Sequence, residues 1–203
     1  MSELLNAHTS NEPYYYLQVA SCAACGGGPL VPEVEDPPGA ATSAGRDRHR
    51  SSVRTRCKRC GQEATFHFRW DRDVAADADD SDCINPSQEP SRIIDLGQWV
   101  SLYHMFSEFA GAAARPVEAR RAARQAALCL AEALKFYRDE ELPPDGAFFW
   151  DASSSAYREN PANFARTRLL DLMAMLPAPA HHAPAQPADA HDEPPAWWRF
   201  WRK

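Results

Sequence analysis

The sequence predicts an α+β fold, in which a small antiparallel sheet packs on a bundle of about three helices and a disordered C-terminal tail follows. A pair of Cys-x-x-Cys-Gly motifs, each beside a strand-like run, predicts the sheet. Long runs with apolar residues at helical spacing begin after residue 95 and predict the helices. With 44% apolar and 25% charged side chains, the 203-residue chain has the composition of a globular protein.

The two cysteine motifs are the most specific signal in the chain. The first contains Cys22 and Cys25, and the second contains Cys57 and Cys60. A structural zinc ion takes four ligands in a tetrahedron, and a two-residue spacer lets both thiolates of one motif reach the same ion. The glycine after each motif's second cysteine permits a positive φ, so the chain can turn beneath the metal. The pattern therefore predicts one structural zinc site with these four cysteines as ligands.

Two metal-free alternatives exist for the four cysteines. A redox dithiol requires a helix that starts at the motif, but the segments that follow the motifs, 26–29 and 61–63, do not resemble helix starts. Disulfides are typical of secreted chains, but residues 1–11 are polar and contain no secretory signal. The four-thiolate zinc site is the interpretation that we favour.

On these motifs, the segment from about residue 14 to residue 70 resembles the zinc-ribbon family. The resemblance covers about a third of the chain, and zinc ribbons often serve the machinery that handles nucleic acid. The spacer between the motifs, residues 26–56, is longer than such sites usually have, which indicates a loop inserted between the two arms. Residues 84–177 resemble no family that we recognise.

Three runs are expected to form the strands. Residues 14–19 are rich in aromatic and β-branched side chains and are predicted to lead into the first motif as a strand. Residues 53–56 alternate and lead into the second motif. A third run places its aromatic side chains on one face and its polar side chains on the other: Phe66, Phe68 and Trp70 against Thr65, His67 and Arg69. Such a small sheet is expected to need both metal and a packed neighbour for stability.

The first helix is expected to begin at Asp95, which forms a capping box with Gln98. Apolar residues then follow at helical spacing on more than one side, which predicts that this helix is buried between layers. They are Leu96, Trp99, Val100, Leu102, Tyr103, Met105, Phe106 and Phe109. The sheet and the helices are therefore expected to share one core.

Two more helices are expected further along the chain. The second spans residues 116–138, because a proline suits the first helical position. Residues 140–159 are predicted to be a long connection with a polar turn at 153–155. The third helix is predicted to have Asn160 as its N-cap and Pro161 at its first position, and to end at Pro177.

The expected organisation has six parts. In chain order they are a flexible N-terminus (1–12), a ribbon (13–72) with an inserted loop (28–50), an acidic and Pro-rich linker (73–92), a helical domain (93–177), a disordered Pro/Ala/His-rich linker (178–196) and an aromatic, basic terminal peptide (197–203).

A basic run precedes and overlaps the second motif and is a candidate nucleic-acid contact through phosphate groups. It consists of Arg46, Arg48, Arg50, Arg54, Arg56, Lys58 and Arg59. Asp71 and several further aspartates follow it, so the alternative is that the two runs are solvated and attract one another. No aromatic residue is interleaved for base stacking, and a net charge of −6 argues against polyanion binding by the whole surface.

The C-terminal peptide is the second candidate contact. Tryptophan and arginine dominate binding hot spots, so we expect it to dock on a partner protein. Association with a membrane surface and folding back onto the helices are the alternatives. The aromatic residues concerned are Trp197, Trp198, Phe200 and Trp201.

The function that the sequence favours is a non-enzymatic zinc-binding adaptor or protein-interaction module of a bacterial-type cytoplasmic protein. Four cysteines complete a zinc shell and leave no position for a substrate. Neither His104 nor Cys129 has a recognisable catalytic partner, and a thiol in mid-helix usually acts as a small apolar side chain. Cys83 and Cys129 lack an obvious disulfide partner, which suits a reducing cytoplasm. The alternatives are nucleic-acid binding through the basic run and membrane association through the tail.

Overall fold

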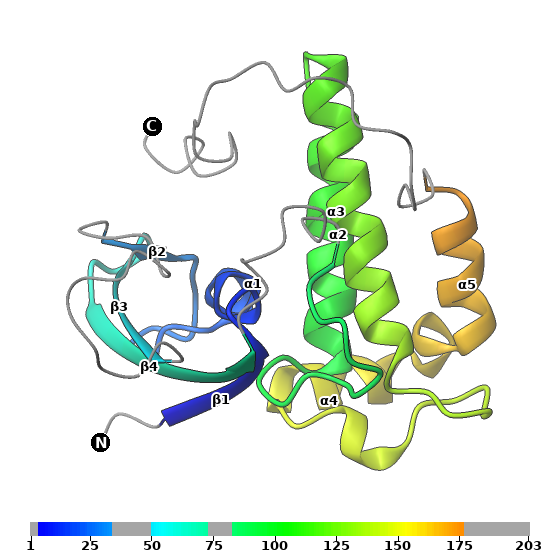
Figure 1. Cartoon of the computed structure of the whole chain (residues 1–203), viewed down its shortest axis with the longest axis horizontal. Coiled ribbons are helices and arrows are strands. Elements are labelled where there is room, and N and C mark those ends of the chain that lie inside the picture. Colours follow the sequence, from blue (N-terminus) through cyan, green and yellow to red (C-terminus); the bar gives the residue numbers. More distant parts are fainter. Residues whose placement is uncertain (1–3, 34–49, 73–82, 177–203) are drawn as a thin grey trace.

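The computed structural model describes residues 4–33, 50–72 and 83–176. These residues form one four-stranded sheet and five α-helices, which confirms the α+β fold (Figure 1). Most of the predicted inserted loop, the aspartates from residue 73 to residue 82 and the C-terminal tail lie outside the described residues.

The sheet has the strand order β1-β4-β3-β2. Strand β3 (Arg50–Cys57) pairs antiparallel with both β4 (Glu63–Arg72) and β2 (Leu30–Pro32). Strand β1 (Leu4–Thr9) pairs parallel with β4. The predicted antiparallel pairing is therefore confirmed for β3 and β4, and the sheet is mixed because β1, which was not predicted, adds a parallel strand.

The prediction of a flexible N-terminus is wrong from residue 4 onward. Ala7, His8 and Thr9 are buried despite the polar composition of this stretch. Their polar groups are satisfied by the segment before α2: the Thr9 hydroxyl donates to the Ile84 carbonyl at 2.7 Å. Because these partners are about 75 residues away in the chain, local composition alone did not indicate a strand.

The alternation predicted for β3 and β4 is confirmed. Val53 and Thr55 are buried, whereas Arg54 and Arg56 are exposed. On β4, Phe68 and Trp70 are buried and Phe66 is half-buried on the same face. We call this the inner face of the sheet, and the opposite one the outer face.

The predicted strand at residues 14–19 is a helix, α1 (Glu12–Val19). Pro13 lies in its first turn, and Glu12 with Tyr16 is buried at helical spacing. Tyr16 packs edge-on against Phe66 and Phe68 of the inner face, with ring centroids 5.8 Å away in both cases. Its neighbour Tyr15 points to the opposite side of the helix, where it contacts α2. Burial between two layers thus overrides the β-propensity of a Tyr-rich run.

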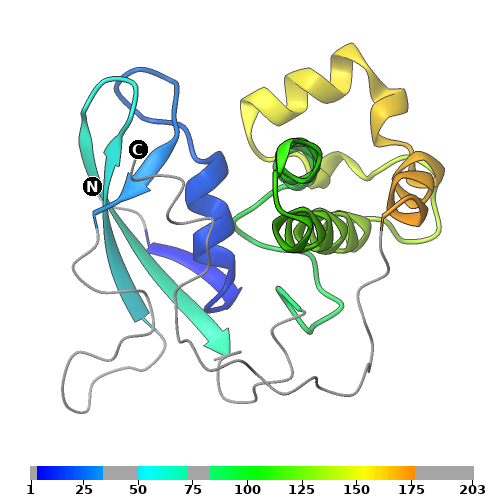
Figure 2. The same cartoon turned by 90° about the horizontal axis from the view of Figure 1, so that it is seen from above.

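Helices α2 (Leu96–Ala112) and α3 (Pro116–Leu134) form a long hairpin on the far side of α1 (Figures 1 and 2). The Tyr15 ring lies 5.6 Å from Trp99 and 6.2 Å from Phe106, measured between centroids. The capping box of Asp95 with Gln98 is confirmed, as is Pro116 at the start of α3. Helix α3 ends four residues before the predicted position. The buried side chains of Phe136 and Tyr137 follow in a turn.

The predicted polar turn at 153–155 is wrong, because these residues belong to α4 (Asp151–Glu159). Asn160 makes no side-chain capping hydrogen bond; a 3₁₀ helix, η2 (Pro161–Phe164), follows it, and a second one, η1 (Asp145–Ala147), precedes α4. The third predicted helix corresponds to α5 (Arg166–Ala174), which begins later and ends earlier than expected. Figure 2 shows α4 and α5 packed around the hairpin, away from the sheet.

Replacing Gly97 with alanine should destabilise the fold by about 1–3 kcal/mol through overpacking. Gly97 lies where α2 meets α4, and an added Cβ would be 2.6 Å from the Ser153 Cβ and 3.2 Å from its Cα. Urea denaturation measures the change. Gly111→Ala on the same helix is the matched control. Its Cβ meets nothing within 4 Å, so it should be neutral or slightly stabilising. Equal effects of the two changes would contradict the close approach of α4.

Candidate metal centre

The first cysteine motif forms a tight turn between α1 and β2. The Gly26 N–H donates to the Cys22 carbonyl at 2.8 Å, and the Cys22 N–H donates to the Gly27 carbonyl at 2.6 Å. Gly26 has a φ of 66°, which a side chain would disfavour. The turn thus needs glycine at the position directly after Cys25.

The second motif repeats this turn between β3 and β4. The Gly61 N–H donates to the Cys57 carbonyl at 2.8 Å, and the Cys57 N–H donates to the Gln62 carbonyl at 2.9 Å. Gly61 has a φ of 75°. The two motifs are therefore equivalent residue for residue, as expected for two halves of one metal site.

Strand pairing brings the two turns together. Leu30, which follows the first turn, is the register partner of Cys57 at the end of β3. The Lys58 N–H also donates to the Pro29 carbonyl at 3.1 Å. The pairing of β2 with β3 therefore places the two motifs next to each other.

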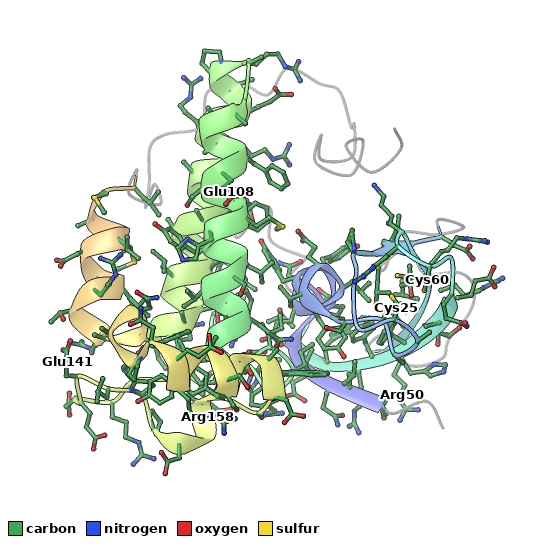
Figure 3. All side chains as sticks on the ribbon, turned by 180° about the vertical axis from the view of Figure 1, so that it is seen from behind. Cys25, Arg50, Cys60, Glu108, Glu141 and Arg158 are labelled. Atoms are coloured by element: carbon green, nitrogen blue, oxygen red, sulfur yellow. The ribbon has the colours of Figure 1, made fainter. Side chains whose placement is uncertain are left out.

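The four predicted ligands lie together. Their sulfur atoms are all within 4.8 Å of one another, so they can hold a metal ion. Two of the sulfur pairs join the two motifs: Cys22 to Cys60 at 3.6 Å and Cys25 to Cys57 at 3.7 Å. Cys22 and Cys57 are buried, whereas Cys60 is exposed. Figure 3 labels Cys25 and Cys60 side by side in the sheet half of the molecule.

The electrostatics of the cluster favour a bound cation. The backbone N–H groups of Cys60 and Arg59 stabilise the Cys57 thiolate and lower its pKa to about 7, against the opposing effect of burial. At Cys60 the Gln62 N–H also lowers the pKa, but burial and the neighbouring thiols outweigh it and raise the pKa to about 12. Four thiolates this close repel one another, and a divalent metal removes that repulsion by coordinating all four.

The structure gives no support to the metal-free alternatives. None of the four cysteines is in a disulfide. In the described part of the chain, the first motif is followed by β2 and the second by β4, so neither motif begins the helix that a redox dithiol requires.

The basic run divides into three parts. Arg50, Arg54 and Arg56 lie on the outer face of β3, and Lys58 and Arg59 belong to the second motif. Arg56 has a structural role because its guanidinium pairs with Glu33 at 2.6 Å and with Glu63 at 2.7 Å. Arg46 and Arg48, together with the tail residues Trp197, Trp198, Phe200 and Trp201, lie outside the described residues.

The sequence predicts no catalytic role for His104 or Cys129, and both have ordinary surroundings in the structure. His104 is exposed on α2. Cys129 is fully buried, and burial raises the pKa of its thiol well above the usual value, which suits a small apolar side chain.

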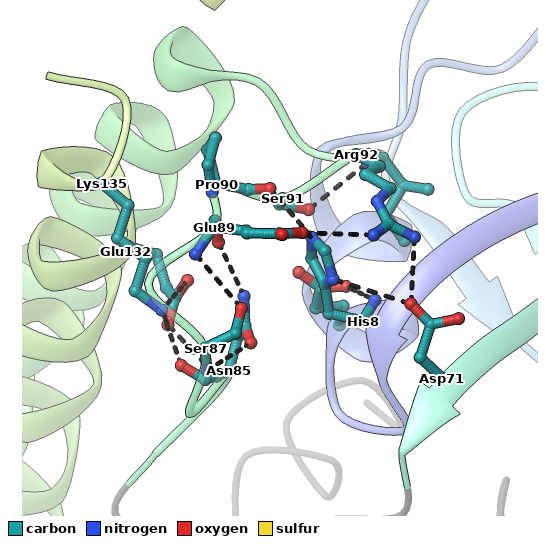
Figure 4. A network of polar contacts seen from close by, with 12 residues as sticks. His8, Asp71, Asn85, Ser87, Glu89, Pro90, Ser91, Arg92, Glu132 and Lys135 are labelled. Atoms are coloured by element: carbon teal, nitrogen blue, oxygen red, sulfur yellow. Dashed lines mark hydrogen bonds and ion pairs between the residues drawn. The ribbon is translucent and has the colours of Figure 1, made fainter. Parts of the chain in front are cut away.

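A polar network that the sequence did not reveal joins the sheet half to α3 through the segment 83–95 (Figure 4). The Asn85 N–H donates to the Glu132 carboxylate at 3.2 Å. Lys135 contacts both oxygens of Glu132 at 2.7 and 2.8 Å, and donates to the Asn85 carbonyl at 2.6 Å. On the sheet side, a His8 ring nitrogen lies 3.0 Å from the Pro90 carbonyl. Glu132 and Lys135 are three residues apart, but their other partners are far apart in the chain, so the sequence does not identify the network.

Two buried carboxyl groups belong to this junction. Burial raises the pKa of Glu132 from 4.5 to about 7, although Lys135 partly opposes the shift. Glu12, which accepts from the His8 N–H at 2.6 Å, also has a pKa raised by burial. The folded state therefore retains protons that the unfolded chain releases as the pH rises above 4.5.

We expect Glu132 to make the fold less stable as the pH rises from about 4.5 to about 7. The protonated Glu132 carboxyl stabilises the folded state fully below the unfolded-state pKa of 4.5. This stabilisation is lost as the pH rises through the folded-state pKa of about 7, and its upper limit is about 3 kcal/mol. Glu132→Gln should remove this part of the pH dependence in urea denaturation between those limits. Glu159→Gln, an exposed change on α4, is the control. If the unfolding free energy of Glu132→Gln depended on pH in the same way as that of the unchanged protein, Glu132 would not be the source of this pH dependence.

The chain matches no family model, no curated protein and no solved structure. Within the described ranges, no helix combines the length and the apolar character needed to cross a membrane.

Proposed function

We propose that the protein is a non-enzymatic binding module whose fold is stabilised by a structural zinc ion. The observation that supports zinc is the spacing of the four sulfurs. With Zn–S bonds of about 2.3 Å, the sulfurs of a tetrahedral site lie about 3.8 Å apart. Two sulfur pairs of the cluster are separated by 3.6 and 3.7 Å, and all four sulfurs lie within 4.8 Å of one another.

A structural role follows from the ligand set. A catalytic zinc keeps a coordination position open for water or substrate, whereas four thiolates close the shell. Both motifs lie in turns at the ends of sheet strands, so the metal would fix how those strands meet. The zinc ion would therefore hold the sheet together and perform no chemistry.

The metal is tested by elemental analysis of the purified full chain combined with X-ray absorption at the zinc edge. We expect one zinc per chain with four sulfur neighbours and no oxygen or nitrogen neighbour. A tetrahedral set of thiolates also suits iron, so iron in place of zinc would overturn the identity of the metal. A shell of three sulfurs and one oxygen would overturn the structural role.

The adaptor role is tested by affinity capture with the full chain and with a chain that ends at Pro195. We expect a partner protein to be recovered only by the full chain, because the truncation removes the aromatic peptide. Identical recovery by both chains would reject the tail as the docking element.

A further inference from the structure

We infer that Cys60 is an oxidation site, at which hydrogen peroxide converts part of the metal cluster into a Cys22–Cys60 disulfide and causes release of the zinc. This inference rests on the proposed structural zinc and names a way in which the same site is regulated. Three observations support it: the exposure of Cys60, the burial of Cys22, and the short distance between their sulfur atoms.

Cys60 is the cysteine of the cluster that an oxidant in solution reaches most readily. All six cysteines lie in the described part of the chain, and among them Cys60 alone is exposed. Cys22 and Cys57 are buried, and Cys25 is half-buried. The position directly after Cys60 has open space around it, because a Cβ added at Gly61 would meet nothing within 4 Å. Since oxidation of a cysteine follows its exposure, Cys60 is the first target.

Coordination also keeps Cys60 in the reactive form. A thiol that coordinates a metal ion is deprotonated, and the thiolate rather than the thiol is the nucleophile. In the metal-bound chain, Cys60 therefore combines thiolate character with exposure, the two properties that make a cysteine susceptible to oxidation.

The oxidation proceeds in two balanced steps. The Cys60 thiolate attacks one oxygen of the peroxide, the O–O bond breaks, and hydroxide leaves, so Cys60 becomes a sulfenic acid. The Cys22 thiolate then attacks the Cys60 sulfur, an S–S bond forms, the S–O bond breaks, and a second hydroxide leaves. Together the two cysteines lose two electrons, and the peroxide takes two protons from solvent to become two water molecules.

Cys22 is well placed for the second step. Its sulfur lies 3.6 Å from that of Cys60. A disulfide bond is about 2.05 Å long, so the two atoms need to approach each other by only about 1.5 Å. Cys22 is 4% exposed, which protects it from direct attack by peroxide. An accessible thiolate beside a resolving cysteine is the arrangement found in redox-sensing sites.

The disulfide removes two of the four metal ligands. Cys25 and Cys57 remain, but a structural zinc site requires four ligands, so zinc should leave. The sulfurs of this remaining pair are 3.7 Å apart, so a second equivalent of peroxide can join them as well. Because the Cys22–Cys60 bridge links the two motifs, it should hold their turns together after the metal has left. Oxidation should therefore release zinc without unfolding the chain.

Zinc release from the purified full chain, followed with a chromogenic chelator after addition of hydrogen peroxide, tests the inference. We expect stoichiometric release and a Cys22–Cys60 disulfide in peptide mass spectrometry. Dithiothreitol and fresh zinc should restore metal binding. Zinc content is measured before peroxide is added, so a chain without zinc would refute the proposed function. A zinc-loaded chain that resists millimolar peroxide, or that forms a Cys57–Cys60 disulfide instead, would refute only the present inference.

Two matched variants separate Cys60 from the rest of the cluster. Structural zinc also accepts three cysteines and one histidine, so Cys60→His and Cys25→His should both bind zinc, which metal analysis checks. Cys60→His lacks the exposed thiolate and should release zinc at least about tenfold more slowly than the unchanged chain. Cys25→His retains both Cys60 and Cys22 and should release zinc within about twofold of the unchanged rate. Equal rates in the two variants would overturn the role of Cys60.

The first site of oxidation can also be measured without any substitution. With less than one equivalent of peroxide, a dimedone-type probe for sulfenic acid should label Cys60 of the unchanged chain before any other cysteine. Earlier labelling of Cys25 or Cys83, which are both half-buried, would contradict the assignment even if neither histidine variant bound zinc.

Discussion

Replacing Cys57 with serine is expected to abolish metal binding and unfold the protein under conditions in which the unchanged chain is folded. Cys57 is buried, and its sulfur is 3.7 Å from that of Cys25 in the other motif. Binding of a structural zinc contributes roughly 10–16 kcal/mol in small zinc domains, which is as large as the whole stability of a typical domain. Metal analysis and thermal unfolding followed by circular dichroism measure the two effects.

We expect this unfolding to include the helices. The sheet, α1 and the α2–α3 hairpin contribute to one continuous hydrophobic core, so loss of the sheet exposes the core side of the hairpin. Cys83→Ser is the matched control, because Cys83 is only half-buried and does not belong to the cluster. It should retain the metal and melt close to the unchanged chain. A Cys57→Ser protein that keeps both its metal and its melting temperature would rule out the four-thiolate site.

The second large effect is expected from Asp95→Ala, with a loss of about 3–5 kcal/mol in the free energy of unfolding. Asp95 is fully buried and its carboxylate serves two helices. One oxygen accepts from the Gln98 N–H at 2.9 Å and from the Ser153 hydroxyl at 2.8 Å. The other accepts from the Trp150 N–H at 3.0 Å. Alanine would remove the N-cap of α2 and leave buried donors of α4 without a partner.

Urea denaturation measures this loss, and Asp151→Ala provides the comparison. Asp151 is exposed in the first turn of α4, where a carboxylate contributes through the helix dipole only about 0.3–1 kcal/mol. Asp95→Asn keeps the shape and one acceptor oxygen, so its loss should fall between the two. A cost below about 1 kcal/mol for Asp95→Ala would mean that α4 does not depend on this carboxylate.

The features that could be predicted from the sequence are those in which a local pattern determines the local structure. The cysteine spacing located all four members of the cluster, and the glycine after each motif has the positive φ expected of it. Alternation identified β3 and β4 with their buried faces. The Asp95–Gln98 pair located the start of α2, because a capping box depends on only four consecutive residues.

The features that were missed depend on distant contacts. Tyr15 and Tyr16 look like strand residues, yet they belong to α1, where Tyr15 contacts α2 and Tyr16 contacts the sheet. On β1, the polar groups of His8 and Thr9 have their partners in the segment 83–95, which the local sequence does not indicate. Helix α4 was not predicted because its consecutive serines resemble a polar turn, although Ser153 is buried against Asp95.

The parallel pairing of β1 with β4 also constrains the order of folding. Leu4 pairs with His67, and Tyr15 of α1 packs on Trp99, so β1 and α1 make these contacts with segments that are synthesised much later. Closing such long loops slows folding, since their entropy is lost before the contacts form. The strands of the sheet half pair with one another, but one side of α1 is buried only when α2 is in place. The core between the sheet and the hairpin is therefore completed late, after α2 has formed.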